Sequence, residues 1–380
     1  MIPVIPARRL GHLVTPALVV ILVAGLALAS RETEIAVWQA IGQLVAPRSQ
    51  AATIPLPDGD VLVLGGIDND DVEVVRTTAE LVDPFTGKVR VLPQRVIGRT
   101  NQTATLAVDK VIVAGGTERV QGRWSPLASV EVFDSKRASW TTAAPMRSPR
   151  SDHAATALRD GRLLVAGGTD GPRQLDSVEI YDPARDAWTA AAPMPEPRSQ
   201  FTITTLPDGR VFVAGGLRRG EPTGSSLFYD AARDVWSDGP RMGAARVLHT
   251  AVTLGGGDVL MVGGQREASG TAERFDFRLE RFFTAGVLAQ PRMLSSAVRV
   301  GSGRVLVVGG LLVDPSREGF TPLGTAELWD PATNEWSDAP DPATARALGS
   351  FVLTQAGALW IGGAGDGEHA LRSIERFSWR

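Results

Sequence analysis

A Gly-Gly pair that closes a short apolar run returns seven times along the chain, and this repetition is the strongest constraint on the fold. The first glycines of the pairs, spaced 46 to 53 residues apart, are Gly65, Gly115, Gly167, Gly215, Gly263, Gly309 and Gly362. The apolar runs before them are about four residues long and rich in valine and leucine, as expected of buried strands. A period of this length indicates an array of similar small units.

Three further landmarks recur at fixed distances within the units. An aspartate follows an apolar residue at Asp83, Asp134, Asp182, Asp230, Asp276 and Asp330. Six positions after each aspartate comes a bulky apolar residue, at Val89, Trp140, Trp188, Trp236, Phe282 and Trp336. Ten positions later comes an arginine, at Arg99, Arg150, Arg198, Arg246, Arg292 and Arg346, and the same spacing joins Trp38 to Arg48. These shared spacings predict units of one common structure.

Each unit is predicted to contain four strands, named a to d in chain order. In the third unit, strand a covers residues 151–158 after Arg150, and strand b ends in the Gly-Gly pair. The b strands are apolar at every position, so we expect both of their faces to be buried between neighbouring sheets. Strand c carries the aspartate, and strand d begins at the tryptophan position. Such units of about 50 residues are typical of β-propeller blades.

In these features the chain resembles the kelch-repeat family. The matching residues are the Gly-Gly pairs, the aromatic-aspartate pairs such as Tyr181-Asp182 and Tyr229-Asp230, and the tryptophan-to-arginine spacing. The resemblance covers residues 36–380 and implies an all-β fold, a seven-bladed kelch-type β-propeller. The departures from the pattern are Val89 and Phe282 in place of tryptophan, and Leu227 where the c strands of other units carry glutamate.

The repeat also predicts how the ring closes. The seventh unit has strands a to c, the last around residues 374–377, but the sequence ends at Arg380 without a strand d. The segment around Trp38 has the opposite deficit, because no strands a to c precede it. We therefore expect this N-terminal strand to complete blade seven, since an unpaired strand edge would otherwise be exposed.

Residues 1–30 are foreign to the repeat and predict export. Arg8 and Arg9 precede an uncharged apolar run over residues 13–29. As a helix, about 17 residues reach roughly 26 Å, which spans a slightly thinned bilayer, so we expect a signal anchor or transmembrane helix. Residues 31–35 would then be a short tether between this N-terminal hydrophobic helix and the propeller.

A cleaved signal peptide stays open as the alternative, because Ala27-Leu28-Ala29 is a usable cleavage site. Both alternatives leave the positively charged end in the cytoplasm and place the propeller outside it. We therefore expect an exported protein of bacterial type in the cell envelope, with the propeller on the extracytoplasmic (periplasmic) side. The membrane would be a partner through the N-terminal helix.

Composition narrows the function classes. The formal net charge is −3, which argues against nucleic acid as a partner. The chain has no cysteine, so no disulfide framework and no thiolate metal site is expected. No phosphate-binding loop, nucleophile elbow or cluster of metal ligands stands out. We therefore predict no cofactor, no metal site and no catalytic residues.

The arginines at the d-to-a junctions are the first candidate site. In a propeller, strand a is innermost, so these arginines are expected near the mouth of the central channel. In kelch propellers that bind acidic peptides, arginines at this junction line the pocket, and the resemblance implies the same possibility for Arg48, Arg99, Arg150, Arg198, Arg246, Arg292 and Arg346. A guanidinium suits a carboxylate because it offers two parallel donors.

A structural role for the same arginines is the alternative. The c strands carry a glutamate three residues before the aspartate position, at Glu80, Glu131, Glu179, Glu273, Glu327 and Glu375. Buried arginine is rarely unpaired, so each arginine would pair with such a glutamate or with loop carbonyls. Both roles are open at this point, the structural one for single arginines and the binding one for the ring as a whole.

The b-to-c connections open on the same face and differ most between units. They cover residues 67–76, 117–127, 217–225 and 311–324. Variable loops on a rigid scaffold commonly carry recognition. The contact candidates in them are Trp124, Arg218, Arg219 and Phe320.

The sequence therefore predicts a membrane-tethered binding or scaffold module whose arginine-lined face meets a protein partner or an acidic ligand. The alternative is a carbohydrate-binding protein or a sugar-mutarotase-like enzyme that uses the same channel face. A copper-radical oxidase of the galactose-oxidase type is not expected, because it needs a cysteine-linked tyrosine and this chain lacks cysteine. Its two tyrosines, Tyr181 and Tyr229, occupy the strand-c position of the repeat.

Overall fold

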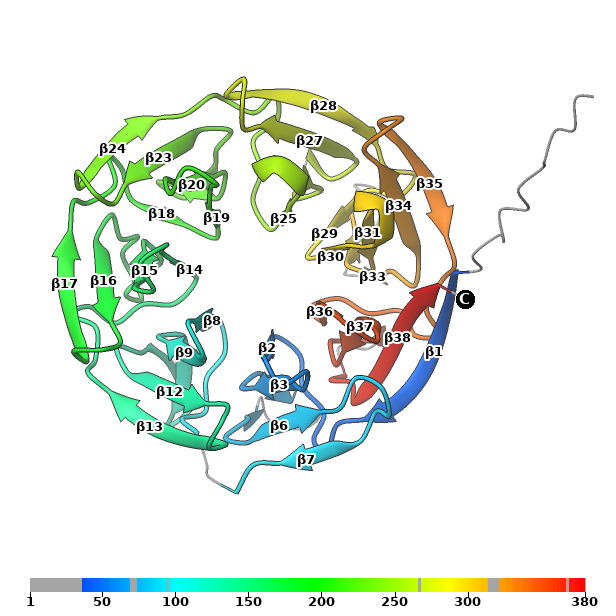
Figure 1. Ribbon diagram of the computed structural model, residues 1–380, viewed down its shortest axis with the longest axis horizontal. Helices are drawn as coiled ribbons and strands as arrows, with labels where there is room; N and C mark the ends of the chain where they lie inside the picture. The colour runs from blue at the N-terminus through cyan, green and yellow to red at the C-terminus, as the bar shows by residue number, and fades with distance from the viewer. Residues whose placement is uncertain are drawn as a thin grey trace, which may run out of the picture. The chain divides into compact units, whose positions relative to one another are not determined.

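In the computed structural model, the described residues form seven four-stranded antiparallel sheets around a common centre (Figure 1). The structure describes residues 36–68, 74–93, 96–265, 268–313, 321–366 and 369–379. The predicted N-terminal helix, the tether and Phe320 lie outside these ranges. In the described part of the chain, no helix is long and apolar enough to cross a membrane. We number the sheets 1 to 7 in the chain order of their innermost strands.

The strand order in every sheet is a, b, c, d from the centre outwards (Figure 1). The a strands of sheets 1 to 7 are β2 (Ala52–Pro55), β8 (Thr103–Ala107), β14 (Ala154–Ala157), β19 (Thr202–Thr205), β25 (Thr250–Thr253), β30 (Ser296–Arg299) and β36 (Ser350–Thr354). The b strands are β3 (Val61–Leu64), β9 (Lys110–Ala114), β15 (Leu163–Ala166), β20 (Val211–Ala214), β26 (Val259–Val262), β31 (Val305–Val308) and β37 (Gly357–Ile361).

The two outer layers follow the same numbering. The c strands are β6 (Ala79–Val82), β12 (Val130–Asp134), β16 (Val178–Asp182), β23 (Ser226–Asp230), β27 (Thr271–Asp276), β34 (Ala326–Asp330) and β38 (Ser373–Trp379). The d strands are β7 (Val89–Val91), β13 (Ser139–Ala143), β17 (Ala187–Ala191), β24 (Val235–Asp238), β28 (Arg281–Val287), β35 (Glu335–Ala339) and, for sheet 7, β1 (Ala36–Gln43).

The core lies between neighbouring sheets, and the b strands are its centre. In β3, β15, β20, β26 and β31 every residue is buried, as the continuous apolar runs predict. One apolar cluster joins Leu164 of sheet 3 to Val211 and Tyr229 of sheet 4, and comparable clusters follow around the ring. Burial of both faces explains why these strands do not alternate polar and apolar residues.

The N-terminal strand closes the ring, as predicted. β1 pairs antiparallel with β38, from Ala36 opposite Trp379 to Gln43 opposite Ser373. The Trp38 ring packs against Phe351, Trp360 and Phe377, with centroids 5.3 to 6.0 Å apart. Its Nε1–H donates to the carbonyl of Pro340, 2.7 Å away in the connection after sheet 6. The first strand therefore belongs to sheet 7 and also contacts sheet 6.

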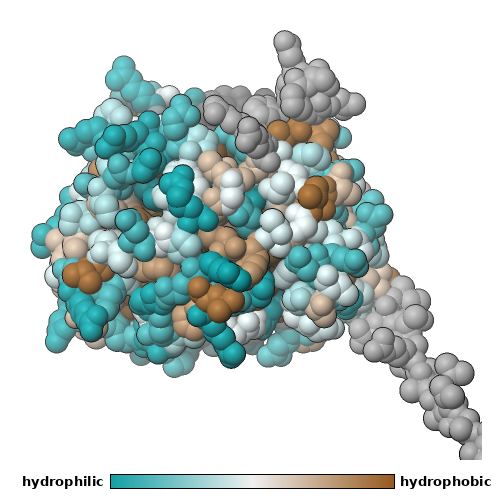
Figure 2. All heavy atoms as spheres, turned by 90° about the horizontal axis from the view of Figure 1, so that it is seen from above, coloured by the Kyte–Doolittle hydropathy of each residue, from teal (hydrophilic) through white to brown (hydrophobic). Residues whose placement is uncertain are grey.

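The tryptophans of the outer strands join neighbouring sheets in the same way. Trp188 donates to the Ala144 carbonyl at 2.7 Å, and Trp236 donates to the Ala192 carbonyl at 2.8 Å. Each acceptor is the residue directly after strand d of the preceding sheet. The tryptophan landmark of the repeat is thus an inter-sheet contact. On the side of the ring seen in Figure 2, hydrophobic residues form small separate patches among polar ones.

The b-to-c connections contain short hairpins rather than plain loops. Their strands are β4 (Ile67–Asp68) with β5 (Val74–Val75), β10 (Thr117–Val120) with β11 (Arg123–Pro126), β21 (Leu217–Arg218) with β22 (Glu221–Pro222), and β32 (Leu311–Leu312) with β33 (Thr321–Pro322). All four also pair with the junction before strand a, two through β18 (Arg198–Ser199) and β29 (Arg292–Met293) and two through the single bridges Ser49–Ile67 and Thr100–Thr117. Because strands alternate in direction, these hairpins and the d-to-a junctions share one face, called here the arginine face. Short 3₁₀ turns, η1 (Gly255–Gly257) and η3 (Gly301–Gly303), connect strands a and b in sheets 5 and 6.

Candidate functional site

The backbone of each junction arginine is tied to the preceding sheet. Its carbonyl accepts a hydrogen bond of 2.7 to 3.1 Å from the second glycine of the preceding Gly-Gly pair. The donor and acceptor pairs are Gly66 and Arg99, Gly116 and Arg150, Gly168 and Arg198, Gly216 and Arg246, Gly264 and Arg292, Gly310 and Arg346, and Gly363 and Arg48. The last pair closes the series between sheets 7 and 1.

The glycine pair is needed for this close approach. Both glycines have positive φ, for example 61° at Gly167 and 90° at Gly168. A Cβ at Gly167 would lie 2.3 Å from the Arg198 carbonyl oxygen, which is too close for two non-bonded atoms, so no other residue fits there. The Gly-Gly landmark therefore marks the places where the arginine backbone of the next sheet packs.

The side chains of six arginines pair with the strand-c glutamates of their own sheets, which confirms the structural alternative. The Nη2-to-carboxylate distances are 2.8 Å for Arg99–Glu131, 2.7 Å for Arg150–Glu179, 2.9 Å for Arg246–Glu273 and 2.5 Å for Arg292–Glu327. Arg48 pairs with Glu80 and Arg346 with Glu375 in the same way. The Nη1 atom of each arginine donates to the carbonyl of the first glycine in its own sheet, as Arg150 does to Gly167 at 2.8 Å.

These six arginines are fully buried. Burial lowers the pKa of each one, and its paired glutamate opposes that effect. A ligand could reach their guanidinium groups only by displacing a buried carboxylate. The arginines lie near the channel mouth, as expected, but their side chains point into the sheets. The binding role predicted for the ring as a whole is therefore not supported at these six positions.

The residues that do reach the channel mouth lie two positions after each arginine. All seven have a left-handed backbone with φ between 52° and 56°: Gln50, Asn101, Asp152, Gln200, Leu248, Leu294 and Leu348. We call these seven residues the mouth ring. Backbone hydrogen bonds of 3.0 Å connect some neighbours directly, from Gln50 N to Leu348 O, Gln200 N to Asp152 O and Leu294 N to Leu248 O.

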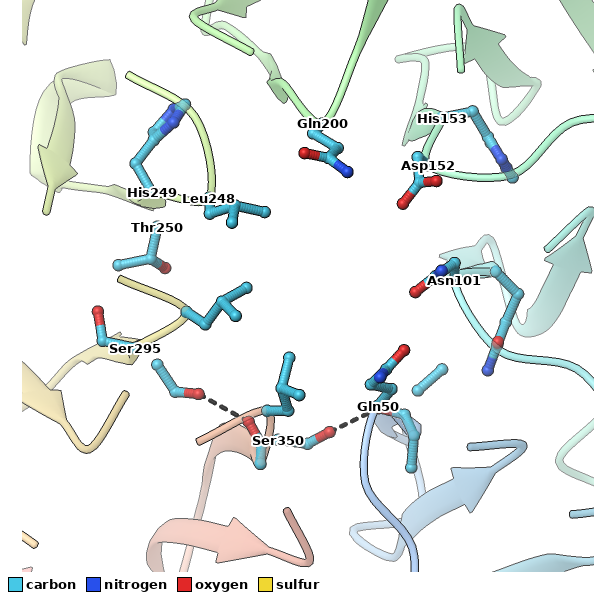
Figure 3. Close-up of a pocket in the computed structure, with 17 residues that line it drawn as sticks. Gln50, Asn101, Asp152, His153, Gln200, Leu248, His249, Thr250, Ser295 and Ser350 are labelled. Atoms are coloured by element: carbon cyan, nitrogen blue, oxygen red, sulfur yellow. Dashed lines mark hydrogen bonds between the residues drawn. The ribbon is translucent and has the colours of Figure 1, made fainter. Parts of the chain in front are cut away.

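The mouth ring is divided into a polar half and an apolar half. Gln50, Asn101, Asp152 and Gln200 follow one another along one side of the opening, and Leu248 lies across from them (Figure 3). Leu248, Leu294 and Leu348 come from the consecutive sheets 5, 6 and 7. The ring lines a cavity of about 420 Å³. One opening therefore offers amide and carboxylate groups on one side and hydrocarbon on the other.

Asp152 is the charged member of the mouth ring. It forms no ion pair within the described part of the chain, and its Oδ2 has the Ser151 hydroxyl at 3.5 Å. Burial raises the pKa of the Asp152 carboxyl, while hydrogen bonds from the Gln200 and Ser151 side chains oppose the rise. A partly buried carboxylate without a cation favours a ligand that brings a positive charge or a hydrogen-bond donor.

Two histidines lie just below the mouth ring, and His153 is buried while His249 is half-buried. His153 Nε2 lies 3.0 Å from the Thr103 hydroxyl, and His249 Nε2 lies 3.1 Å from the Thr202 hydroxyl. Burial and nearby arginines lower the pKa of each histidine to about 3, so both are neutral at physiological pH. In the ranges that the structure describes, no group of three or more histidine and carboxylate side chains is placed to hold a metal ion.

Comparison with known proteins gives the family. The model of the KLHDC2/KLHL20/DRC7 Kelch-repeats domain matches residues 101–310, which is more than half of the chain. The chain belongs to the Kelch-repeat family. Kelch repeats generally mediate protein–protein interaction. No curated protein sequence matches this Kelch chain.

Solved structures share the fold of this Kelch chain at low sequence identity. A fungal alcohol oxidase of the AA5 family, in complex with copper, is 18% identical with a TM-score of 0.75, over 91% of this chain and 76% of the oxidase. The protein YjhT is 15% identical with a TM-score of 0.59, over 74% of this chain and 97% of YjhT. At these identities the likeness shows the propeller fold alone.

The two tyrosines of the Kelch chain lie away from the mouth. Tyr181 and Tyr229 are buried in c strands, opposite Trp188 and Trp236 in the d strands. The Tyr181 hydroxyl donates to Asp186 at 2.8 Å, and the equivalent hydroxyl in sheet 4 donates to Asp234 at 2.7 Å. Both are thus part of the sheet packing that the repeat predicts.

The remaining sequence candidates lie on the hairpins of the arginine face. Trp124 in β11 is 40% exposed, and the Arg119 guanidinium lies 5.5 Å from its ring centroid. Arg218 and Arg219 both pair with Glu196, at 2.6 and 3.2 Å. Trp124 lines a pocket together with Gln50 and Asn101, and Arg219 lines another together with Asp152 and Gln200, so both lie beside the polar half of the mouth ring. Phe320 falls outside the described residues.

The mouth ring is not apparent from the sequence alone. Leucine and glutamine carry no sign of a left-handed backbone, and leucine disfavours it. The available signal was positional, because each mouth residue follows an arginine of the repeat by two positions. Comparing that column across the units shows the change from polar residues in sheets 1 to 4 to leucine in sheets 5 to 7.

Proposed function

We propose that this Kelch protein is a seven-bladed, non-catalytic binding module that takes up part of a protein partner at the mouth ring on its arginine face. The observation that carries the proposal is the division of this ring into a polar and an apolar half. The arginines themselves hold the face together rather than contact the partner. A partner segment with an apolar group beside a cationic or N–H donor group fits both halves.

The choice of leucine at the mouth supports a binding role. The fold imposes the left-handed backbone at all seven positions, and there it costs roughly 1–2 kcal/mol for an ordinary residue. Asparagine or glycine would fit with less strain, and Asn101 does so in sheet 2. Three leucines that face the opening are therefore unfavourable for stability alone. Apolar groups exposed at a concave opening are typical of binding sites.

The location forms part of the same proposal. The apolar run over residues 13–29 is long enough for an anchor, and the positive charges before it would keep that end in the cytoplasm. We propose that the propeller acts on the extracytoplasmic side of a membrane, tethered by this segment. Expression of residues 1–380 and 31–380, followed by membrane fractionation, tests this part separately. Recovery of both in the soluble fraction would contradict the tether.

The binding proposal is tested by replacing Leu248, Leu294 and Leu348 together with asparagine. Because asparagine accepts the left-handed backbone, the variant should keep its thermal stability while the apolar half is lost. Wild type and variant, each purified from mild detergent extracts of the source cells, are compared by quantitative mass spectrometry, and the partner is then titrated as a purified protein. We expect the affinity to fall at least tenfold.

A matched control is Leu279→Asn, which removes an exposed leucine at a c-to-d turn on the opposite face. It should leave partner binding unchanged. Equal binding by the triple variant and the wild type would contradict the assignment of the mouth ring.

A carbohydrate is the second candidate ligand, and the polar half of the ring favours it. Asparagine, glutamine and aspartate side chains are the groups that hydrogen-bond sugar hydroxyls. The residues that line this cavity include no Trp, Tyr or Phe, but the half-exposed Trp124 lines a neighbouring pocket together with Gln50 and Asn101. A sugar ring could therefore stack only at that edge of the polar half. Saturable sugar binding that is lost with Asp152→Asn, together with the absence of a protein partner, would decide for this candidate.

A further inference from the structure

Sheet 4 differs from the other six in the buried pair beneath the arginine face. Where they carry a glutamate, it has Leu227 in β23, which is 4% exposed and part of the apolar core. The arginine is nevertheless retained. Arg198 is 2% exposed, and within the described residues it forms no ion pair. A buried arginine has thus lost the internal carboxylate that its six equivalents keep.

The rest of the carboxylate-binding arrangement is conserved in sheet 4. Arg198 Nη1 donates to the carbonyls of Gly215 and Ser225, at 2.8 and 3.0 Å, as the other arginines do in their sheets. Its Nη2 donates to the Ser225 hydroxyl at 2.8 Å. In sheet 3 the matching Nη2 of Arg150 binds Ser177 and also Glu179. Arg198 Nη2 therefore keeps one of these two acceptors.

Sheet 4 also lacks one of the backbone N–H groups that bind the strand-c glutamate in the other sheets. In the other sheets each glutamate accepts an N–H two or three residues before the arginine, such as Ile97 in sheet 2 or Ala343 in sheet 7. In sheet 4 the position three before Arg198 is Pro195, which has no N–H. The position two before it, Glu196, retains an N–H, and this is the donor position that serves Glu131 in sheet 2.

The local charge is positive. The Glu196 carboxylate, which also lines this region, is engaged by Arg218 at 2.6 Å and by Arg219 at 3.2 Å. At the six other arginines a glutamate opposes the effect of burial, whereas at Arg198 the second influence is the positive charge of Arg218. Together they lower the pKa of Arg198 to about 10, which leaves it charged at pH 7. The pKa of Arg346 is also lowered to about 10, although Arg346 has a paired glutamate. Arg198 therefore differs from Arg346 in having a neighbouring arginine in place of a carboxylate, and not in its pKa.

A cavity of about 610 Å³ gives access to this arginine. Arg198, Ser225 and Leu227 line it, and Arg218 and Arg241 from neighbouring connections line it as well. Arg241 is exposed to solvent. The cavity shares none of its lining residues with the mouth ring. It is therefore a second site on the arginine face.

We propose that this cavity binds a carboxylate from outside the chain, which takes the place of the missing strand-c glutamate on Arg198, the Ser225 hydroxyl and the Glu196 N–H. A carboxylate is planar and has two oxygens, and the other six sheets bind a glutamate carboxylate at the equivalent place. A tetrahedral phosphate would bring further charge and oxygen atoms towards Leu227 and the Glu196 and Asp238 carboxylates. The group can come from an acidic side chain of a protein partner or from a small free carboxylate.

The test compares the wild type with Leu227→Glu and Leu227→Met. Leu227→Glu supplies the internal carboxylate in an arrangement that the fold uses six times, so the variant should fold and be more stable. Leu227→Met keeps an apolar side chain of similar volume and serves as the matched control. Binding is measured by calorimetry and by the shift of the melting temperature at constant ionic strength. The probes are acetate, succinate, inorganic phosphate, and the peptides acetyl-Ala-Glu-Ala-amide and acetyl-Ala-Gln-Ala-amide.

We expect saturable binding of the carboxylates to wild type and Leu227→Met, and at least tenfold weaker binding to Leu227→Glu. A glutamate peptide that binds at least tenfold tighter than acetate identifies a protein partner as the source, and the reverse order identifies a free carboxylate. No carboxylate binding to wild type, equal binding to Leu227→Glu, or tighter binding of phosphate would overturn the proposal. The triple asparagine variant of the mouth ring should bind the carboxylates normally, so this test and that of the proposed function can fail independently.

Discussion

The guanidinium of Arg150 donates to the Glu179 carboxylate at 2.7 Å, with both side chains almost completely buried. The same glutamate accepts the backbone N–H of Arg147 at 2.8 Å, and the Arg150 carbonyl accepts the N–H of Gly116 from the preceding sheet. One buried pair thus joins a junction, its own strand c and the neighbouring sheet. Its repetition around the ring explains why the arginine, the glutamate and the Gly-Gly pair recur together in the sequence.

The first prediction is that Glu179→Leu, which gives sheet 3 the residue found in sheet 4, destabilises the protein strongly. It leaves the buried Arg150 charge unpaired and removes the acceptor for the Arg147 N–H. Breaking a buried pair in this way costs about 3–5 kcal/mol. Urea unfolding measures the loss. The control is Lys136→Gln, which removes a solvent-exposed pair with Asp109 and should change the stability little, because solvent screens exposed charges. Similar losses in the two variants would contradict the structural role of the buried pair.

The second prediction concerns the closing strand. A protein of residues 31–380 keeps β1 and should unfold like the full chain. A protein of residues 47–380 loses the whole β1–β38 ladder and the Trp38 packing, a loss of several kcal/mol against a total stability of about 5–15 kcal/mol. Circular dichroism melting compares the two. Equal melting temperatures would show that the pairing of β1 does not support the ring.

Much of this architecture is visible in the sequence because it rests on local, repeated requirements. The Gly-Gly pairs are needed where a neighbouring backbone approaches, and the apolar b strands are needed where both faces are buried. The missing strand d of the seventh unit then fixes the role of the segment around Trp38. Each of these features reflects backbone or burial constraints, which residue types express directly.

The candidate site could not be obtained in the same way. The spacing placed the arginines at the channel mouth, but it could not show whether Arg150 points into the opening or back towards Glu179. The mouth residues owe their position to a left-handed turn that Leu248 or Gln50 would not adopt alone. The significance of Leu227 also needed the structure, because only there is Arg198 seen to be buried beside a cavity.

The third prediction concerns His153 and His249 and the loss of stability in acid. Their pKa in the folded protein is about 3, below the ordinary value of 6.5, so both are neutral when folded and take up protons when unfolded. Their contribution to stability is therefore complete above pH 6.5 and is lost as the pH falls from there towards 3. Each histidine adds about 1.4 kcal/mol per pH unit to this loss.

The double variant His153→Gln and His249→Gln tests this effect. Glutamine is already present at the equivalent position in sheet 2, where Gln102 donates to the Leu64 carbonyl at 3.4 Å. The free energy of unfolding, measured between pH 7 and pH 4, should fall less steeply in the variant than in the wild type. Parallel curves would mean that these histidines do not differ in protonation between the folded and unfolded states.

The last prediction concerns Asp152, which the proposed function uses as the acidic group of the mouth ring. Burial raises its pKa in the folded protein, so the folded state binds the proton more tightly than the unfolded state does. The stabilising contribution is therefore complete at low pH, below the ordinary aspartate pKa, and is lost as the pH rises through the raised value. Asp152→Asn removes this penalty and should unfold at a higher temperature than the wild type at pH 7, with the difference shrinking near pH 3.

The same variant should bind the partner more weakly, because the carboxylate that faces the cationic or N–H group is gone. Lower stability at pH 7, or unchanged partner binding, would show that Asp152 serves the fold rather than the site.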